Sequence, residues 1–269
     1  MDETKRIYYG YPDRMWEKRY HSKFLIRRYI HRTQYETIIK YVKFFKPKLI
    51  LDYGCGEGVL STLLAERDFN LIGVDISKPN IKVAKKHSLQ KHLNIKYVIG
   101  DVENLPFKDN SFELVVSSHV LEHLNEIEKG LCEIKKISEK AIIAVPTCLS
   151  LSSLSMLGGD VPWKITKKTP FAVFSGLLKL TKNFNKNGVI EKYSSKEFPH
   201  VWFYPWKFKR ILENNGFNVI KIEASSLCLP YISYFYPNTI KIFKFMDRFK
   251  DKKPLNIFGY GTTYIVEVR

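Results

Sequence analysis

The stretch Leu49-Ile50-Leu51-Asp52-Tyr53-Gly54-Cys55-Gly56-Glu57-Gly58 decides how the rest of the chain is interpreted. Its first half is a short apolar run typical of a buried strand, and its second half is a glycine-rich turn. A helix-like run, Val59 to Glu66, follows at once. Strand, tight turn and helix form the first half of a βαβ unit that binds a nucleotide, because the first N–H groups of the helix point at a ligand above the turn.

The spacing of the glycines narrows the choice of ligand. Gly54, Gly56 and Gly58 form a G-x-G-x-G pattern, whereas a dinucleotide fingerprint would need its third glycine where Val59 stands. A phosphate-binding P-loop would need Gly-Lys-Ser/Thr after the turn, which is absent. Asp52 puts a carboxylate at the strand end, where it would repel a pyrophosphate and would suit a ligand with cationic groups. A tight turn that binds no ligand is the alternative.

The pattern Asp52-x-Gly54-x-Gly56-x-Gly58 resembles motif I of the class I S-adenosylmethionine-dependent methyltransferases. The resemblance continues through the fourth motif, including the run Val120 to Leu124, and covers most of residues 48–146. It implies that S-adenosylmethionine is the cofactor. The turn residues implied to bind it are Asp52, Tyr53, Gly54, Cys55, Gly56 and Gly58.

Further cofactor-binding residues are expected at the ends of the following strands. Asp75 ends a strand 17 residues after Gly58, and an acid at this position can accept hydrogen bonds from both ribose hydroxyls. Ile76, the next residue, is expected to bind the cofactor as well. The resemblance implies that Asp101 bonds the adenine amino group and that Val102 packs on the ring. Ser118 ends the fourth strand. Parallel strands place all these ends at one edge of the sheet. Taken alone, Asp101 would be read as an ordinary turn residue.

Strands separated by helices predict an α/β fold, a doubly wound, seven-stranded and mostly parallel sheet of the Rossmann-like methyltransferase type. The apolar runs expected as core strands include 49–53, 70–75, 94–99, 111–118 and 141–146. Residues 1–47 are expected to form an N-terminal helical cap and residues 48–269 the methyltransferase domain. Loss of periodicity predicts insertions at about 147–200 and 227–257, which would cover the substrate.

Methyl transfer to a hydroxyl or an amine benefits from a general base with a near-neutral pKa. His119, directly after the fourth strand, is the first candidate, and His200, at the end of the first insertion, is the second; either is alternatively a structural residue. Thr147-Cys148 matches a dipeptide of RNA cytosine-C5 enzymes, but their Pro-Cys after strand four is missing. Glu122 and His123 alone are too few acids and histidines for a metal site, so no metal is expected.

The net charge is +17, and its distribution is uneven. Residues 51–150 carry 12 basic and 14 acidic side chains, whereas residues 151–210 carry 11 and 3. The excess favours an anionic partner, although a solvated lysine-rich surface explains it equally well. Residues 227–253 mix apolar and basic residues, which suggests either peripheral membrane contact or a pocket cover or dimer contact. The oligomeric state is left open.

The four cysteines show no C-x-x-C pairing, and the first residues show neither a signal peptide nor an apolar span. A reducing, cytoplasmic location is therefore expected. We expect a methyltransferase that acts on a hydroxyl or amine of a small-molecule, glycan or lipid-linked acceptor, and the basic charge favours an anionic one. The alternatives are an RNA methyltransferase, for which charge is the only argument, and a non-catalytic S-adenosylmethionine-binding protein.

Overall fold

A computed structural model describes residues 3–193, 198–236 and 238–269. Within these residues, seven strands form one sheet in the order β3-β2-β1-β4-β5-β9-β8, and β6 and β7 form a separate antiparallel pair. The five strands from β3 to β5 in this order are parallel, whereas β9 is antiparallel to both of its neighbours. The strands are β1 (Ile50–Tyr53), β2 (Leu71–Asp75), β3 (Lys96–Ile99), β4 (Leu114–Ser118), β5 (Lys140–Pro146), β6 (Gly188–Tyr193), β7 (Phe198–Phe203), β8 (Phe217–Ala224) and β9 (Gly261–Val268).

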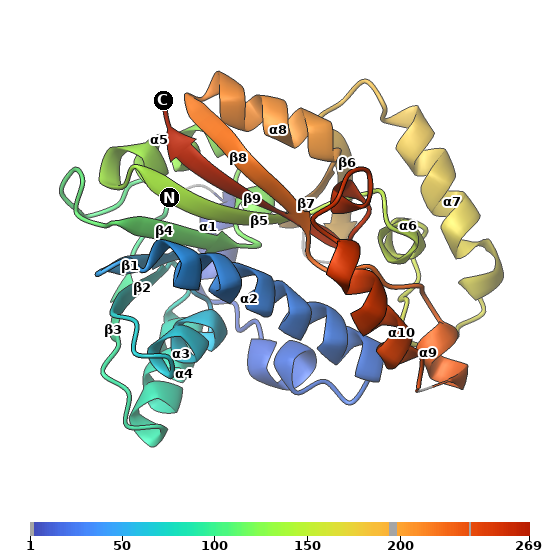
Figure 1. The fold of residues 1–269 in the computed structure, drawn as a ribbon, viewed down its shortest axis with the longest axis horizontal. Helices are drawn as coiled ribbons and strands as arrows, with labels where there is room; N and C mark the ends of the chain where they lie inside the picture. Colours follow the sequence, from blue (N-terminus) through green and yellow to red (C-terminus); the bar gives the residue numbers. More distant parts are fainter. Residues whose placement is uncertain (1–2, 194–197, 237) are drawn as a thin grey trace.

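Helices cover both faces of the large sheet and also form a group of their own at one end of the molecule (Figure 1). The longer helices are α2 (Leu25–Phe45), α4 (Lys78–Gln90), α5 (Ile127–Ile137), α7 (Thr169–Lys182), α8 (Pro205–Asn214) and α10 (Thr239–Met246). The shorter ones are α1 (Glu3–Tyr9), η1 (Trp16–Tyr20), α3 (Val59–Ala65), η2 (Leu121–His123), α6 (Leu151–Leu157), α9 (Ile232–Phe235), η3 (Asp247–Phe249) and η4 (Leu255–Ile257).

The sheet is buried on both faces because successive side chains of its central strands point to opposite sides. On β5, Ile143 packs with residues of α5 and α8, whereas Ile142 packs with residues of α2 and α3. On β1, Leu51 packs in the same cluster as Ile143, and Ile50 packs in the same cluster as Ile142. This two-sided burial explains why the strand segments are apolar runs rather than alternating patterns.

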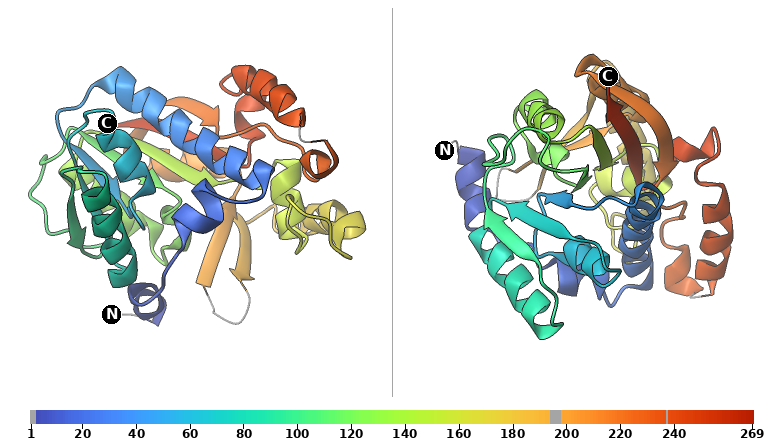
Figure 2. Two further views of the ribbon diagram at one scale, coloured as in Figure 1. Left: turned by 90° about the horizontal axis from the view of Figure 1, so that it is seen from below. Right: turned by 60° about the vertical axis from the view of Figure 1, so that its left-hand side comes forward.

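The predicted fold class, a doubly wound and mostly parallel seven-stranded sheet, is confirmed. The expected insertions correspond to α6, α7 and the β6–β7 hairpin, and to α9, α10, η3 and η4, although residues 194–197 and 237 lie outside the described residues. Both helical groups lie at the same end of the molecule (Figure 2). Among the described helices, none is both long enough and apolar enough to span a bilayer.

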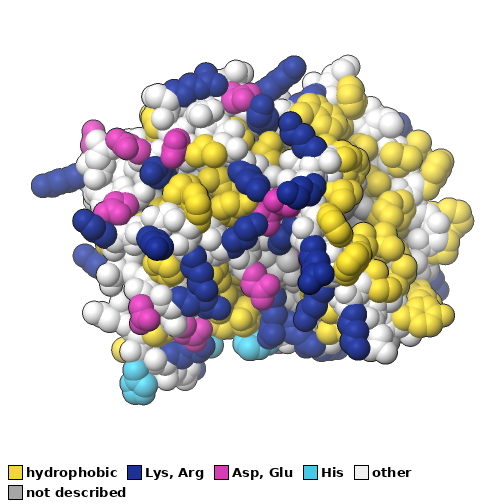
Figure 3. All heavy atoms as spheres, viewed as in Figure 1, with side chains coloured by type: hydrophobic (Ala, Val, Ile, Leu, Met, Phe, Trp, Pro, Cys, Tyr) yellow, Lys and Arg dark blue, Asp and Glu magenta, His cyan; other side chains and the backbone are white. Residues whose placement is uncertain are grey.

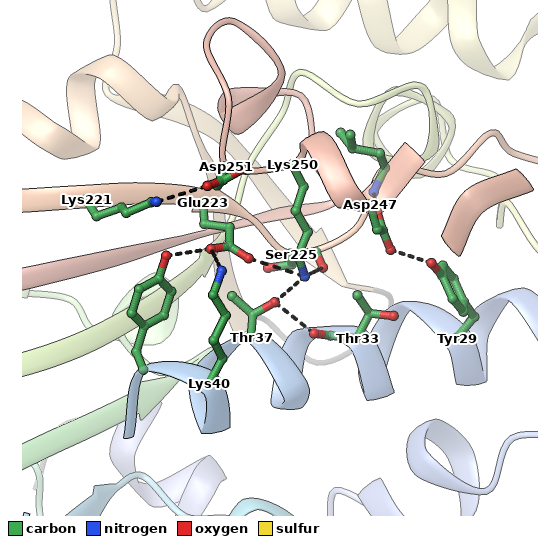
Figure 4. A network of polar contacts seen from close by, with 12 residues as sticks. Tyr29, Thr33, Thr37, Lys40, Lys221, Glu223, Ser225, Asp247, Lys250 and Asp251 are labelled. Atoms are coloured by element: carbon green, nitrogen blue, oxygen red, sulfur yellow. Dashed lines mark hydrogen bonds and ion pairs between the residues drawn. The ribbon is translucent and has the colours of Figure 1, made fainter. Parts of the chain in front are cut away.

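A buried ion-pair network fixes α2 against the C-terminal strands (Figure 4). Glu223 on β8 accepts hydrogen bonds from Lys40 Nζ at 2.7 Å and from the Tyr41 hydroxyl at 2.5 Å. Lys250 Nζ lies 3.6 Å from the other Glu223 oxygen and donates to Thr37 Oγ1 at 2.5 Å. Burial lowers the pKa of Lys250, and the nearby Glu223 and Asp247 oppose this shift.

We expect Glu223→Ala to lower the free energy of unfolding by about 3–5 kcal/mol, because it leaves Lys250 buried without its counter-ion. Glu267→Ala is the matched control, since Glu267 lies on β9 in a half-exposed pair with Lys140 at 3.8 Å. That pair should contribute at most about 1 kcal/mol. Urea denaturation of both variants measures the difference, and equal losses would contradict the assignment of a stabilising role to the Glu223 network.

Candidate functional site

The glycine turn between β1 and α3 lies beside the carboxyl end of β2. The backbone N–H of Gly56 and that of Ser77 each donate to the Asp75 carboxylate at 2.8 Å. Gly56 has a φ of 53°, in the left-handed region that favours glycine, and a Cβ there would lie 2.7 Å from Met15 Sδ. Burial raises the pKa of Asp75 to about 7, in spite of these two hydrogen bonds.

A pocket lies above this turn, at the carboxyl ends of the parallel strands. This is the position at which doubly wound sheets bind their ligands. The predicted site residues brought together here are Gly54, Gly56, Asp75, Ile76, Asp101, Val102, Ser118 and His119. The walls carry both polar and apolar side chains, so the pocket suits a ligand of mixed character.

The N-terminal segment forms one wall of the pocket. Lys5 Nζ on α1 lies 2.6 Å from Asp101 Oδ2 and 2.5 Å from Glu103 Oε2. The Tyr8 hydroxyl lies 2.8 Å from His123 Nδ1. Asp13, Met15 and Arg19 complete this wall. The segment therefore lies over the loops that follow β3 and β4, and its Met15 lies close to the glycine turn after β1.

Four of the predicted cofactor-binding residues do not line the pocket. Asp52 is buried behind the turn, where it accepts a hydrogen bond from Ser61 Oγ at 2.5 Å, and burial raises its pKa to about 6. The Tyr53 hydroxyl donates to the Val102 carbonyl at 2.8 Å. Cys55 packs with Ile81, Ala84 and Tyr97, and a Cβ at Gly58 would meet the Tyr97 hydroxyl. In this structure these four residues shape and support the turn, because the side chains of Asp52, Tyr53 and Cys55 pack behind it and Gly58 leaves room for Tyr97.

His119 has an unusual backbone and an unusual environment. It adopts a φ of 59°, rare for a residue other than glycine, immediately after β4. Its Nδ1 lies 2.8 Å from Glu122 Oε1, and its Nε2 is buried without a hydrogen-bond partner among the described residues. Burial by itself would raise the pKa of Glu122, but His119 and the nearby His123 and His200 lower it to about 2. Glu122 is therefore ionised at neutral pH and accepts the proton of Nδ1.

His200, the second candidate base, lies on β7 behind His123 and does not line the pocket. Its ring centroid is 5.0 Å from that of His123 and 5.3 Å from that of Trp202. Burial, reinforced by the charge of His123, lowers the pKa of His200 to about 3, so its imidazole is a weak base. Glu122, His123 and His200 bring potential ligand atoms within 4.8 Å of one another, a grouping that the sequence did not predict.

Comparison with known proteins identifies the part of the chain that surrounds this pocket. Residues 51–141 match the family model described as "Methyltransferase domain". These residues form a class I S-adenosylmethionine-dependent methyltransferase domain. They include the glycine turn, Asp75, Asp101 and the His119–Glu122 pair, so most of the pocket lining belongs to this domain, and the N-terminal segment adds one wall.

Curated relatives match the methyltransferase domain over part of their length. The ubiquinone biosynthesis O-methyltransferase of Pelagibacter ubique is 35% identical over 91 residues, which cover 34% of this chain and 38% of the relative. The enzyme of the same name from Coxiella burnetii is 39% identical over 84 residues, covering 31% and 36%. The chain thus spans less than two fifths of the length of these relatives.

Solved structures extend the likeness of fold to the whole chain. A Pyrococcus horikoshii OT3 protein aligns with a TM-score of 0.60 and 18% identity over 100% of both chains. The magnesium protoporphyrin IX methyltransferase of Synechocystis PCC 6803, solved with bound SAH, aligns with a TM-score of 0.56 and 16% identity over 99% of this chain and 93% of the other. The likeness to these two structures is therefore one of fold and extends beyond residues 51–141.

Sequence reasoning missed the residues that the N-terminal segment contributes. Lys5, Tyr8, Asp13 and Arg19 precede the motifs and follow no spacing rule of their own. Glu122 stands within the fourth motif, but only the fold shows that it holds His119. A signal was present there, because positions three apart at the start of a helical turn can place a carboxylate beside an imidazole.

Proposed function

We propose that this chain transfers the methyl group of S-adenosylmethionine to a hydroxyl of a small-molecule or lipid-linked acceptor, with His119 as general base. The observation that carries the proposal is the His119–Glu122 pair. His119 lines the pocket that also contains Asp75 and the glycine turn, and its Nε2 is buried without a hydrogen-bond partner among the described residues.

The pocket fits S-adenosylmethionine in shape and in chemistry. Gly54 and Gly56 keep side chains out of the space above the turn, so the backbone can approach a ligand. Asp75 would accept bonds from the ribose hydroxyls, and Asp101 with Val102 would hold the adenine, with Ile76 and Ser118 along the nucleoside. When bound, the cofactor supplies a methyl group already activated on a sulfonium.

Lys5 pairs with the carboxylate that is proposed to bind the adenine amino group. A cofactor would have to share Asp101 with Lys5 or displace it, while Glu103 remains as a second partner for the lysine. The N-terminal segment also limits the access of water to the reacting groups, which favours methyl transfer to the acceptor over loss to solvent.

A hydroxyl acceptor explains why the site holds a base. The ionised Glu122 would hold the proton of His119 on Nδ1, so that Nε2 would carry the lone pair that takes up a proton. As the acceptor oxygen attacks, its proton passes to Nε2. A positioned base of this kind contributes about 10² to 10⁴-fold in rate. The name of the curated relatives, an O-methyltransferase, supports oxygen over nitrogen as the acceptor atom.

Methyl-labelled S-adenosylmethionine tests the proposal when it is incubated with the full chain and with cell extract divided into small-molecule, lipid, glycan and RNA pools. We expect label in the small-molecule or lipid pool, on an oxygen. Label confined to RNA would overturn the acceptor class. Absence of label in every pool, with cofactor binding intact by calorimetry, would favour a binding protein without catalysis.

A further inference from the structure

Two helical insertions carry an unusual number of exposed apolar side chains. We define the α7–α10 surface as the exposed residues of the segments 164–186 and 232–249. Its large apolar members are Ile165, Phe171, Phe174, Leu177, Leu178, Phe184, Ile232, Tyr234, Phe235, Tyr236, Ile242, Phe245 and Phe249. Scattered single apolar residues are ordinary on a surface, but a gathering of this size marks an interaction site.

The packing of α7 explains why its apolar side chains face outward. Among the residues of α7, Ala172 and Gly176 are the buried ones, and both contact α6. A Cβ at Gly176 would lie 1.9 Å from the Leu154 carbonyl oxygen, so the two helices meet backbone to backbone. Phe171, which is 72% exposed, and Phe174, which is 63% exposed, stand on the rest of the helix.

The two insertions form one continuous unit rather than two separate flaps. Tyr231, just before α9, donates from its backbone to the Pro162 carbonyl at 2.8 Å and from its hydroxyl to Asp160 at 2.9 Å. Phe243 of α10 and Trp163 share one apolar cluster with residues of α6. Figure 3 shows the result, since hydrophobic side chains gather over α7, α6, α9 and α10 at one end of the molecule.

The charged side chains described on this surface are mostly basic. Residues 161–190 contain six lysines and no acidic residue. Lys241, Lys244 and Arg248 are exposed on or beside α10. The acid in that segment, Asp247, is turned inward, where it bonds the Tyr29 hydroxyl and the backbone N–H of Leu227. The apolar side chains therefore stand within a belt of positive charge, and an anionic partner would meet no repulsion there.

We propose that the α7–α10 surface docks on an anionic lipid bilayer. Exposed Phe, Leu and Ile side chains on helices, bordered by lysines, are the features of helices that lie in the plane of a membrane interface. The apolar groups enter the boundary between headgroups and acyl chains, and the lysines pair with anionic headgroups. This docking does not depend on the proposed reaction.

Vesicle sedimentation of the full chain tests the proposal. We expect binding to vesicles of phosphatidylcholine with about a third phosphatidylglycerol, and binding at least about tenfold weaker to pure phosphatidylcholine. The double variant Phe171→Ser with Phe174→Ser should lose at least about tenfold in affinity for the anionic vesicles. The matched control, Phe44→Ser with Leu89→Ser, removes two equally exposed apolar side chains outside this surface and should bind as the original chain does.

Replacing lysines of the α7–α10 surface tests the electrostatic part of the proposal in the same vesicle assay. Lys182→Gln with Lys186→Gln, at and just after the end of α7, should weaken binding more than Lys85→Gln with Lys86→Gln, an exposed pair on α4. Equal loss in both lysine pairs, or equal loss in both apolar pairs, would reduce the effect to nonspecific attraction and overturn the proposal. A further result would also overturn it: the chain does not bind vesicles, light scattering shows a dimer, and Phe171→Ser with Phe174→Ser dissociates that dimer. A second copy of the chain would then cover the surface.

Discussion

Replacing His119 by Asn is expected to lower kcat by about 10² to 10⁴-fold while the affinity for S-adenosylhomocysteine changes by less than about threefold. Asn tolerates the left-handed backbone that His119 adopts, so the change removes the base without forcing the chain to rearrange. Its amide can still face Glu122, but it places no atom where Nε2 stood. Initial-rate kinetics and calorimetry on the same preparation separate the two effects.

His92→Asn is the matched control for His119→Asn. His92 is an exposed histidine with a φ of 55°, so it shares the backbone conformation but lies outside the pocket. Its replacement should leave kcat unchanged. Glu122→Gln acts through His119 and should also lower kcat, and the double variant should lose little more than either single one, because the pair works as a unit. Undiminished turnover in His119→Asn would remove His119 as the base.

Gly56→Val is expected to weaken the binding of S-adenosylhomocysteine by more than about 100-fold, a loss of roughly 3 kcal/mol. The left-handed backbone of Gly56 disfavours any side chain, and a Cβ would already lie 2.7 Å from Met15 Sδ, which also lines the pocket. A valine would therefore occupy the space where the cofactor is proposed to lie. Isothermal titration of the full chain measures the change.

Gly159→Val separates lost binding from lost stability. Gly159 also has a positive φ, 83°, but the atom nearest to a Cβ at this position would be Lys168 Nζ, at 3.8 Å, and the residue does not line the pocket. Both valine variants should lose about 1–3 kcal/mol of stability from backbone strain. Only Gly56→Val should lose the cofactor. Retention of affinity in Gly56→Val would contradict the placement of the cofactor above the turn.

Local spacing in the sequence was enough to predict the sheet and one side of the pocket. Gly54, Asp75, Asp101 and His119 each directly follow or end a predicted strand, and the parallel arrangement brings such positions to one edge. Spacing also predicted more pocket residues than the structure shows, because a motif does not tell which way each side chain points. Asp52 and Cys55 belong to the motif and yet pack behind the turn.

Contacts between segments far apart in the chain were beyond reach of the sequence. Lys5 meets Asp101 and Tyr8 meets His123, and each pair is separated by about a hundred residues. No periodicity marks such contacts, since they arise from the path of the N-terminal segment across the sheet. The helix α7 was missed because its apolar residues face outward and its packing face consists of Ala172 and Gly176, which carry almost no hydrophobic signal.

The sequence by itself determined the class of domain, because buried parallel strands must be apolar throughout and a close approach to a ligand demands glycine at fixed spacing. Only the tertiary structure decided which residues surround the pocket and how burial and neighbouring groups shift their pKa values. Burial and partners depend on neighbours that the chain brings in from elsewhere. The opening stretch thus defines a turn, and the fold supplies the Glu122 that orients His119, the N-terminal wall, and the basic apolar surface at the far end.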